Sequence, residues 1–316
     1  MSRYLTGRIA QALLVLWGAY TITYCVLYLL PGDPLSIMLS ASGMEVDSLS
    51  PAQLAKARAY YGLDQDVVTR YLHLLWGVLH GDLGQSLTLN RPVTSVLAER
   101  LPQTLALAGS AIVLSLFGGI GLAYLAAYVR WQPLKTALAR LPALGFSVPV
   151  FWMGLLLIQV FAFSLGWFPS TGSDGIASLV LPAITLAVPS AAVYAQVLQR
   201  GFMDVWREPY ILTAYAKGLS RAQVQARHGF RNAALPLLTL IGLQVGNTVS
   251  GAVLVETIFA RNGVGRLVQD AVLRQDIPVV LAVVTVSAGA FVVINLIVDL
   301  LYPILDPRIT HSPKVS

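Results

Sequence analysis

Cysteine and charge are both scarce in this sequence. A single cysteine, Cys25, rules out a disulfide within the chain and a cysteine-rich metal site. Charged residues make up 11% of the 316 residues and hydrophobic residues 56%, whereas a soluble domain carries about 25% charge. A water-soluble surface cannot be built from the polar residues that remain. The composition therefore predicts one integral membrane domain in a lipid bilayer.

Catalytic motifs are absent as well. The sequence has no Gly-x-x-x-x-Gly-Lys-[Ser/Thr] phosphate loop, no His-Glu-x-x-His and no Gly-x-Ser-x-Gly. The four histidines are scattered over loops and tail without the spacing of metal ligands: His73, His80, His228 and His311. We therefore predict a chain that is not an enzyme and has no catalytic residue, no metal site and no cofactor of its own. It either takes energy from a partner or works passively.

Long apolar windows are abundant. Six of them have the roughly 20–25 residues that span a bilayer: Ile9–Leu30, Thr104–Tyr128, Leu141–Leu165, Leu179–Leu198, Leu235–Phe259 and Val279–Leu301. They must be helices or a closed barrel, because lipid offers the backbone no hydrogen-bond partner, and the alternating strands of a barrel are not seen. The first window is too long for the apolar core of a signal peptide, which predicts an uncleaved helix. We expect an all-α integral membrane protein with six transmembrane helices.

Lysine and arginine predict the orientation of these helices. The N-terminus, the second connection and the fourth connection are rich in basic residues, which resist translocation across the membrane. Residues 31–103 instead contain more acids than bases. The N- and C-termini are therefore predicted to be cytoplasmic, and 31–103 extracytoplasmic. In a membrane protein the position of each base matters more than the net charge of +6, so we predict no nucleic-acid partner.

These windows divide the chain into five parts. We predict a cytoplasmic N-terminus (1–8), a first helix (9–30), an extracytoplasmic insertion (31–103), a membrane core of helices two to six (104–303) and a cytoplasmic tail (304–316). The insertion is too long for a bare loop and predicts two helices, one from Ser50 to Tyr61 and one over 66–79. A short amphipathic interfacial helix is predicted over 266–273.

The connection 199–236 is the longest and most basic on the cytoplasmic side. Its residues Thr213, Ala214, Ala216 and Lys217 favour a short helix. Gly218 is a natural helix stop and Ser220 can cap a second helix. Small residues at 214, 216 and 218 would allow close approach of a partner protein. The alternative is a charged interfacial helix that only enforces topology.

A few polar residues interrupt the apolar windows. Polar groups in hydrocarbon usually face the bundle interior or a water-filled path. Gln244 and Asn247 are the best candidates to line a solute path, ahead of Gln159, Gln196 and Asn295. Hydrogen bonding between helices is the alternative.

Several motifs together resemble one transporter family. Thr213-Ala-Tyr-Ala-Lys-Gly-Leu-Ser220, followed by Arg227-His-Gly-Phe-Arg-Asn-Ala-Ala-Leu-Pro236, is similar to the cytoplasmic loop signature of binding-protein-dependent ABC transporter permeases of the dipeptide/oligopeptide/nickel branch. The resemblance covers nearly the whole chain and extends to the segments Leu30–Pro34, Arg100–Leu105, Ser147–Trp152, Gly166–Gly172, Glu256–Arg266 and Asp299–Arg308.

The resemblance implies a fold, a mechanism and a set of partners. It implies a type I ABC importer permease fold in the bacterial cytoplasmic (inner) membrane, carrying a dipeptide, an oligopeptide, nickel or a metal chelate. The expected partners are a second homologous permease subunit in a heterodimer, two ATP-binding subunits that hold ATP and Mg, and an extracytoplasmic solute-binding protein. Six residues would sit in a cleft of the ATP-binding subunit and couple its closure to the membrane helices: Thr213, Ala214, Tyr215, Ala216, Lys217 and Gly218.

Two other functions stay open from the residues alone. An ATP-independent secondary transporter or channel would need charges deep in the helices and internal repeats, and neither is evident. A membrane anchor or assembly factor would bind a partner through the outer insertion and have no solute path.

Overall fold

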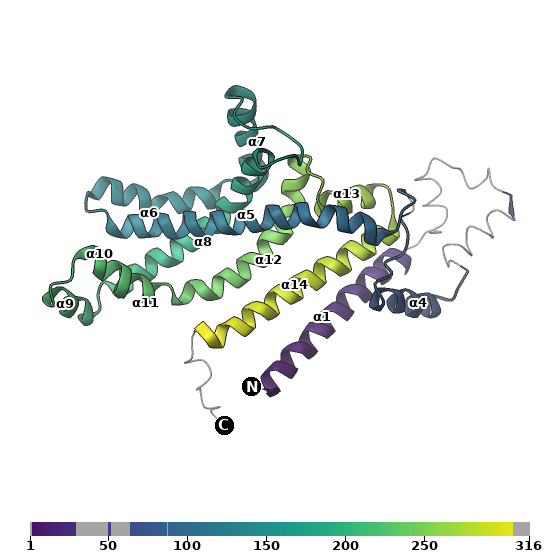
Figure 1. Ribbon diagram of the computed structural model, residues 1–316, viewed down its shortest axis with the longest axis horizontal. Coiled ribbons are helices and arrows are strands. Elements are labelled where there is room, and N and C mark those ends of the chain that lie inside the picture. Colours follow the sequence, from purple (N-terminus) through teal and green to yellow (C-terminus); the bar gives the residue numbers. More distant parts are fainter. Residues whose placement is uncertain (1, 30–49, 52–63, 87, 306–316) are drawn as a thin grey trace. The chain divides into compact units, whose positions relative to one another are not determined.

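The computed structural model describes residues 2–29, 50–51, 64–86 and 88–305, and the regular elements in these residues are helices (Figure 1). The helix predicted from Ser50 to Tyr61 lies outside the described residues beyond its first two positions. The chain divides into two units, Met1–Gln103 with Asn262–Val293 and Thr104–Arg261 with Ile294–Ser316. Two long helices, α5 (Val93–Tyr128) and α14 (Ile277–Leu305), run from one unit into the other.

The first unit contains α1 (Ser2–Leu29) and α4 (Val67–Leu79), besides the beginnings of α5 and α14. The Asp66 side chain caps α4 by accepting a hydrogen bond from the backbone N–H of Val68 at 3.2 Å. The Tyr71 ring of α4 packs against Tyr20 and Tyr24 of α1, at centroid distances of 5.6 and 5.2 Å. The second helix predicted in the insertion is thus confirmed.

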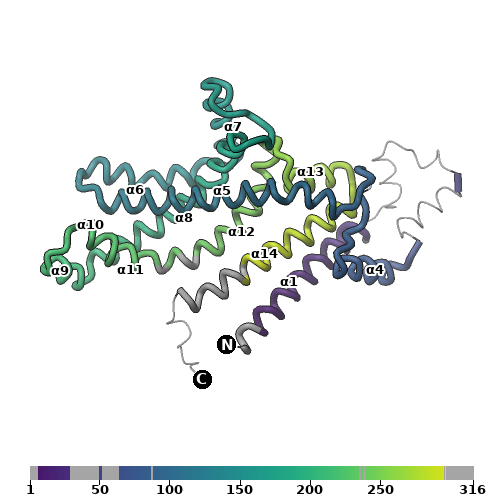
Figure 2. Tube along the Cα trace, in the orientation of Figure 1, coloured from purple at the N-terminus to yellow at the C-terminus, as the bar shows by residue number. Residues whose placement is uncertain are grey.

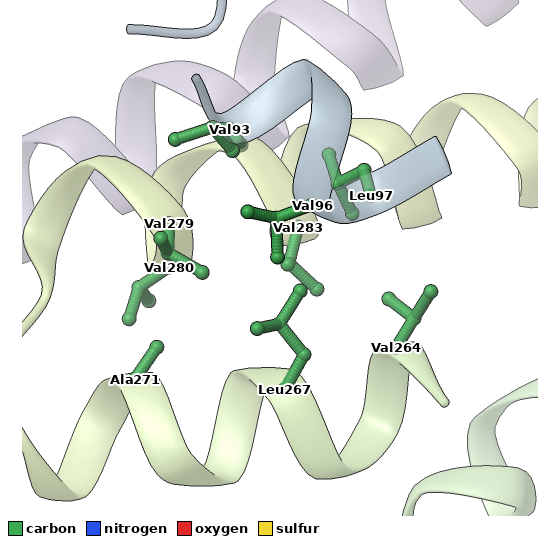
Figure 3. Close-up of a cluster of buried hydrophobic side chains, with 10 residues drawn as sticks. Val93, Val96, Leu97, Val264, Leu267, Ala271, Val279, Val280 and Val283 are labelled. Atoms are coloured by element: carbon green, nitrogen blue, oxygen red, sulfur yellow. The ribbon is translucent and has the colours of Figure 1, made fainter. Parts of the chain in front are cut away.

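The core of the first unit is made of valine and leucine side chains that meet from three helices. Figure 3 shows the beginning of α5 facing α13 (Val264–Leu273) and the first turns of α14. The residues that meet there are Val93, Val96, Leu97, Val264, Leu267, Ala271, Val279, Val280 and Val283. The helix predicted over 266–273 is confirmed, but its apolar face packs in a protein core, and its predicted place at the membrane interface stays a prediction.

A buried carboxylate holds the connection between α13 and α14 in the same unit. The Asp276 carboxylate accepts hydrogen bonds from Ser86 Oγ at 2.6 Å, Thr88 Oγ1 at 2.8 Å and the Thr88 backbone N–H at 3.1 Å. Asp276 is 1% exposed, and these three donors compensate the cost of removing its carboxylate from water.

The second unit is built around α8 (Ala177–Val205), which is buried along its length. Helices α6 (Gln132–Ser147) and α12 (Leu235–Ile258) both pack against it. Glycine permits the closest approaches. A Cβ on Gly119 of α5 would lie 2.7 Å from the Ala191 carbonyl oxygen, and one on Gly201 would lie 2.7 Å from the Ala233 carbonyl oxygen. Small residues at helix crossings are typical of membrane bundles.

The third predicted window requires a correction, because Leu141–Leu165 is not one continuous helix. Helix α6 ends at Ser147, and the chain resumes as α7 (Val150–Leu157) and the π-helix η2 (Ile158–Ser164) after a bend of 104°. Pro149 lies at the break and is the N-cap of α7. Proline has no N–H to give to the preceding turn, so a helix ends before it.

Within the described residues, four helices are long and apolar enough to cross a membrane: Thr6–Tyr28, Val93–Tyr128, Ala177–Val205 and Ile277–Ile294. The bent pair brings the number to as many as five. Helix α12 has 24 residues and coincides with the fifth predicted window, but it is not in that number. The count of six spans stays a prediction.

Candidate functional site

The connection 199–236, predicted to be cytoplasmic, contains a short helix, a tight turn and a second helix. Helix α9 (Pro209–Ala216) begins with a proline, whose missing N–H is no loss in the first turn. It ends before Gly218, which has a φ of +81°. The Gly218 N–H donates to the Tyr215 carbonyl at 2.9 Å, and the Leu219 N–H to the Ala214 carbonyl at 3.3 Å. These bonds close the end of the helix and need the left-handed conformation that glycine adopts without strain.

The second helix starts with a capping box. The Ser220 hydroxyl accepts from the Gln223 backbone N–H, and the Gln223 side chain accepts from the Ser220 N–H at 2.9 Å. Helix α10 (Arg221–Val224) is followed by the π-helix η3 (Gln225–Phe230) and by α11 (Arg231–Ala233). Figure 2 shows these short helices following one another at the end of the second unit where α8 ends. The predicted helix, turn and helix are confirmed.

Helix α9 has one buried and one exposed face. Ile211 and Ala214 pack into a core with Leu198, Phe202 and Val224. Leu212 is 74% exposed, and Thr213, Tyr215, Ala216, Lys217 and Gly218 are exposed too. Ala214 is 5% exposed, so its side chain faces the core of the unit, and its predicted contact with a partner protein stays a prediction. Its small side chain lets α9 lie close to the rest of the unit.

Two side chains attach this surface element to the end of α5, and the sequence did not indicate either contact. Arg221 donates from Nη2 to the Ala127 carbonyl at 3.1 Å, and Gln225 donates from Nε2 to the Tyr124 carbonyl at 2.8 Å. Gln225 is fully buried. A mid-segment glutamine carries no local signal for such a bond, because its acceptor lies 101 positions away in the chain.

The predicted path residues Gln244 and Asn247 lie together on α12. Asn247 Nδ2 donates to Gln244 Oε1 at 2.7 Å, and Gln244 Nε2 donates to Ser190 Oγ of α8 at 3.3 Å. Gln244 is 8% exposed and Asn247 is exposed. Gln244 thus makes a hydrogen bond between helices, which was the alternative to lining a path. It also orients the Asn247 amide.

A buried charged cluster joins motifs that lie far apart in the chain. Glu256 accepts from Thr104 Oγ1 at 2.6 Å, and Arg261 donates from Nη1 to the Ser178 carbonyl at 2.9 Å. The Gly172 N–H donates to the Phe259 carbonyl at 3.0 Å. Burial lowers the pKa of Arg261 and the Glu256 carboxylate acts against that shift. The cluster fastens the beginning of α8 to the end of α12.

In the described part of the chain, no group of three histidine, cysteine, aspartate or glutamate side chains is placed to hold an ion.

Comparison with known proteins agrees with these features. The family model described as binding-protein-dependent transport system inner membrane component matches residues 119–311, and the model for the N-terminal part of such membrane components matches 1–108. The chain is similar to a putative peptide transport system permease protein of Brucella abortus (strain 2308), with 37% identity over 320 residues, 99% of this chain and 100% of that one. It is also similar to the dipeptide transport system permease protein of Escherichia coli (strain K12), with 34% identity over 343 residues and the same coverage. A glutathione transport system permease protein of Salmonella choleraesuis (strain SC-B67) is 36% identical over 312 residues, 99% of this chain and 100% of that one.

Solved structures show the same fold. An inward-facing methionine ABC transporter matches with a TM-score of 0.55 and 14% identity, over 67% of this chain and 96% of that one. An amino acid ABC transporter with histidines matches with a TM-score of 0.50 and 20% identity, over 68% and 94%. The chain therefore belongs to the family of inner membrane components of binding-protein-dependent transport systems, the permease subunits of ABC importers.

Proposed function

We propose that this permease forms half of the translocation pathway of an ATP-driven peptide importer. The proposal is supported by similarity along 99% of the chain to proteins named as peptide, dipeptide and glutathione permeases. The other half is a second homologous permease subunit, so that the membrane part is a heterodimer. Two ATP-binding subunits hold ATP and Mg and hydrolyse the nucleotide, and an extracytoplasmic solute-binding protein delivers the peptide.

The chain crosses the inner membrane six times in this proposal, with both termini in the cytoplasm. Residues 31–103 form the extracytoplasmic insertion, and 104–303 the permease core. The distribution of basic residues supports this orientation, because the bases gather in the N-terminus and in the connections that hold α9 and the beginning of α6.

The exposed face of α9 is the docking surface for an ATP-binding subunit. This is the observation that carries the proposal. A leucine that is 74% exposed at position 212 stands beside Tyr215 on a helix of only 8 residues. Apolar side chains gathered on an exposed element mark a protein contact. The buried Ile211 and Ala214 fix the helix from behind, so force on its outer face reaches the core of the unit.

Asn247 lines the solute path and Gln244 holds it in place. Asn247 is exposed on α12, and its amide is oriented by the 2.7 Å hydrogen bond to Gln244. A polar side chain presented from a membrane helix fits a water-filled path better than lipid.

Replacement of Leu212 by glutamate tests the docking surface. Loss of a central apolar contact weakens binding of the ATP-binding subunits by about tenfold or more, and peptide-stimulated ATP hydrolysis falls with it. Co-purification and ATPase activity of the reconstituted complex give the two readouts. Ala222→Glu adds the same charge at an exposed position of α10 and serves as the control. Normal peptide-stimulated hydrolysis in the Leu212→Glu complex would refute the assignment.

A further inference from the structure

A basic pocket lies in the second unit among the ends of α5, α8 and α9 and the beginnings of α6 and α10. It has a volume of about 450 Å³, and four cationic side chains line it: Arg130, Lys135, Arg207 and Arg221. Two aromatic side chains, Trp206 and Tyr215, also line it. None of the described residues that line it is acidic. Such a concentration of one charge favours an anion.

The positive charge of the pocket is only partly compensated by the protein. Arg221 is engaged, because it donates to the Ala127 carbonyl and lies over the Tyr128 ring at 5.6 Å. The side chains of Arg130, Lys135 and Arg207 make no hydrogen bond or ion pair with the part of the chain that the structure describes. The carbonyl ends of α5 and α8 attract cations weakly. Three flexible bases thus remain available to a ligand.

Aromatic residues near the pocket are of the kind found at the depth of lipid headgroups. The rings of Trp206 and Tyr215 stack at a centroid distance of 6.5 Å and an interplanar angle of 15°. Trp131 is 66% exposed, and Tyr128, whose ring lies under Arg221, is 43% exposed. Exposed tryptophan and tyrosine at the end of membrane helices are typical of the boundary between hydrocarbon and water.

An apolar pocket continues from the basic one between α5, α6 and α8. It has a volume of about 340 Å³ and shares Ala127, Lys135, Met203 and Trp206 with its neighbour. It extends along Ala126, Ala139 and Phe202, and the side chains of Gln196, Gln199 and Arg200 also line it. The two pockets together therefore combine a cluster of basic groups with a neighbouring space whose wall is mostly apolar and includes one further base, Arg200. That combination suits a phosphate group attached to a hydrocarbon chain and not a phosphate alone.

We propose that the joined pockets bind an anionic phospholipid of the cytoplasmic leaflet. Its phosphate lies among Arg130, Lys135 and Arg207, and an acyl chain follows the apolar pocket. Basic pockets between membrane helices on the cytoplasmic side are known to suit such headgroups. The inference rests on the proposed orientation of the chain. Because Tyr215 belongs to both the pocket and α9, a bound lipid would steady the docking helix.

Lipid retention by the purified importer complex tests the proposal. The complex is taken from nanodiscs of phosphatidylglycerol and phosphatidylcholine, and the lipids that stay bound are counted by native mass spectrometry. Removing two of the bases by Lys135→Gln with Arg207→Gln lowers the affinity for phosphatidylglycerol about 30-fold, since each base near the surface contributes about fivefold. Phosphatidylcholine retention stays unchanged. The double variant Arg140→Gln with Arg227→Gln removes the same charge from exposed cytoplasmic positions outside both pockets and keeps the wild-type affinity.

Three results would overturn the proposal. One is equal retention of phosphatidylglycerol in both double variants. A second is displacement of the lipid by inorganic phosphate at an ionic strength matched with chloride, which would assign the pocket to a soluble anion. A third is loss of the ATP-binding subunits from the Lys135→Gln/Arg207→Gln complex in phosphatidylcholine alone, which would make the bases part of a protein interface. Retention does not require transport, so failure here is distinct from failure of the proposed import function.

Discussion

Single residues decide where α9 ends and where α10 begins. Gly218 and Ser220 act through local backbone chemistry, one as a left-handed stop and the other as a cap. Both roles could be predicted from the sequence, because the rules that govern them involve only a few neighbouring residues. The burial of Ala214 could not, because a helix of 8 residues has too little periodicity to tell which face packs inward. The contacts of Gln225 and Glu256 could not be predicted from the sequence either, because their partners are distant in the chain.

Replacement of Gly218 tests the turn. At a φ of +81° a valine is strained by about 1–2 kcal/mol, and the end of α9 should open more often. Limited proteolysis with trypsin at Lys217 and Arg221 in the detergent-solubilised complex measures this opening. We expect Gly218→Val to be cut faster than wild type. Gly218→Asn is the matched control, since asparagine tolerates this conformation better, and equal cleavage of the two variants would contradict the argument.

The buried charges at Glu256 and Arg261 are predicted to be coupled. Removing one partner leaves the other charge buried, which costs about 3–5 kcal/mol. Glu256→Gln and Arg261→Met should therefore each lower the thermal unfolding temperature of the complex strongly. The double variant should be less unstable than the sum of the two single changes. Additive losses would show that the two charges do not act on each other.

At the scale of elements, an apolar window gives the part of a helix that suits lipid, whereas the helix itself can be longer. Apolar windows located α1, α8, α12 and α14 well, because burial in lipid and helix length coincide there. Helix α5 instead begins at Val93, ahead of its window at Thr104. Glu99, Arg100 and Gln103 lower the hydropathy of its first turns but are compatible with a helix. The bend after α6 has a sequence cause, Pro149, but hydropathy alone could not reveal it.

Helix contact between α5 and α8 can be tested with two glycines of the same helix. A Cβ at Gly119 would come within 2.7 Å of backbone and side-chain atoms of α8, whereas one at Gly121 would have nothing within 4 Å. Gly119→Ala should lower stability by about 1–3 kcal/mol through overpacking. Gly121→Ala should be neutral or slightly stabilising, because alanine favours a helix. Thermal unfolding of the purified complex checks both, and the reverse order would refute the crossing.

At the scale of the whole molecule, the family and the all-helical membrane fold could be read from the sequence. Composition excluded a soluble protein, and many weak motifs in one order indicated the family. The number of spans and the orientation follow from charge and hydropathy rather than from contacts within one chain. In the proposed function, partner chains complete the solute path and the docking surface, so that one chain holds only part of the site.

Orientation can be measured by cysteine labelling, because Cys25 is the only native cysteine. In a Cys25→Ser background, Asp174→Cys should react with a membrane-impermeant maleimide added to spheroplasts. Lys217→Cys should react only after the membrane is permeabilised. Both positions are exposed, so access to the reagent depends on the side of the membrane. Labelling of Lys217→Cys in sealed spheroplasts would reverse the proposed topology.

The hydrogen bonds from Arg221 and Gln225 to α5 depend on side-chain identity at the donor but not at the acceptor. Both acceptors are backbone carbonyls, at Ala127 and Tyr124. A substitution on α5 that keeps the helix leaves those oxygens in place, whereas a substitution at either donor removes a bond. The link between the segment Arg221–Phe230 and α5 therefore depends on the side chains of only one of the two segments that it joins.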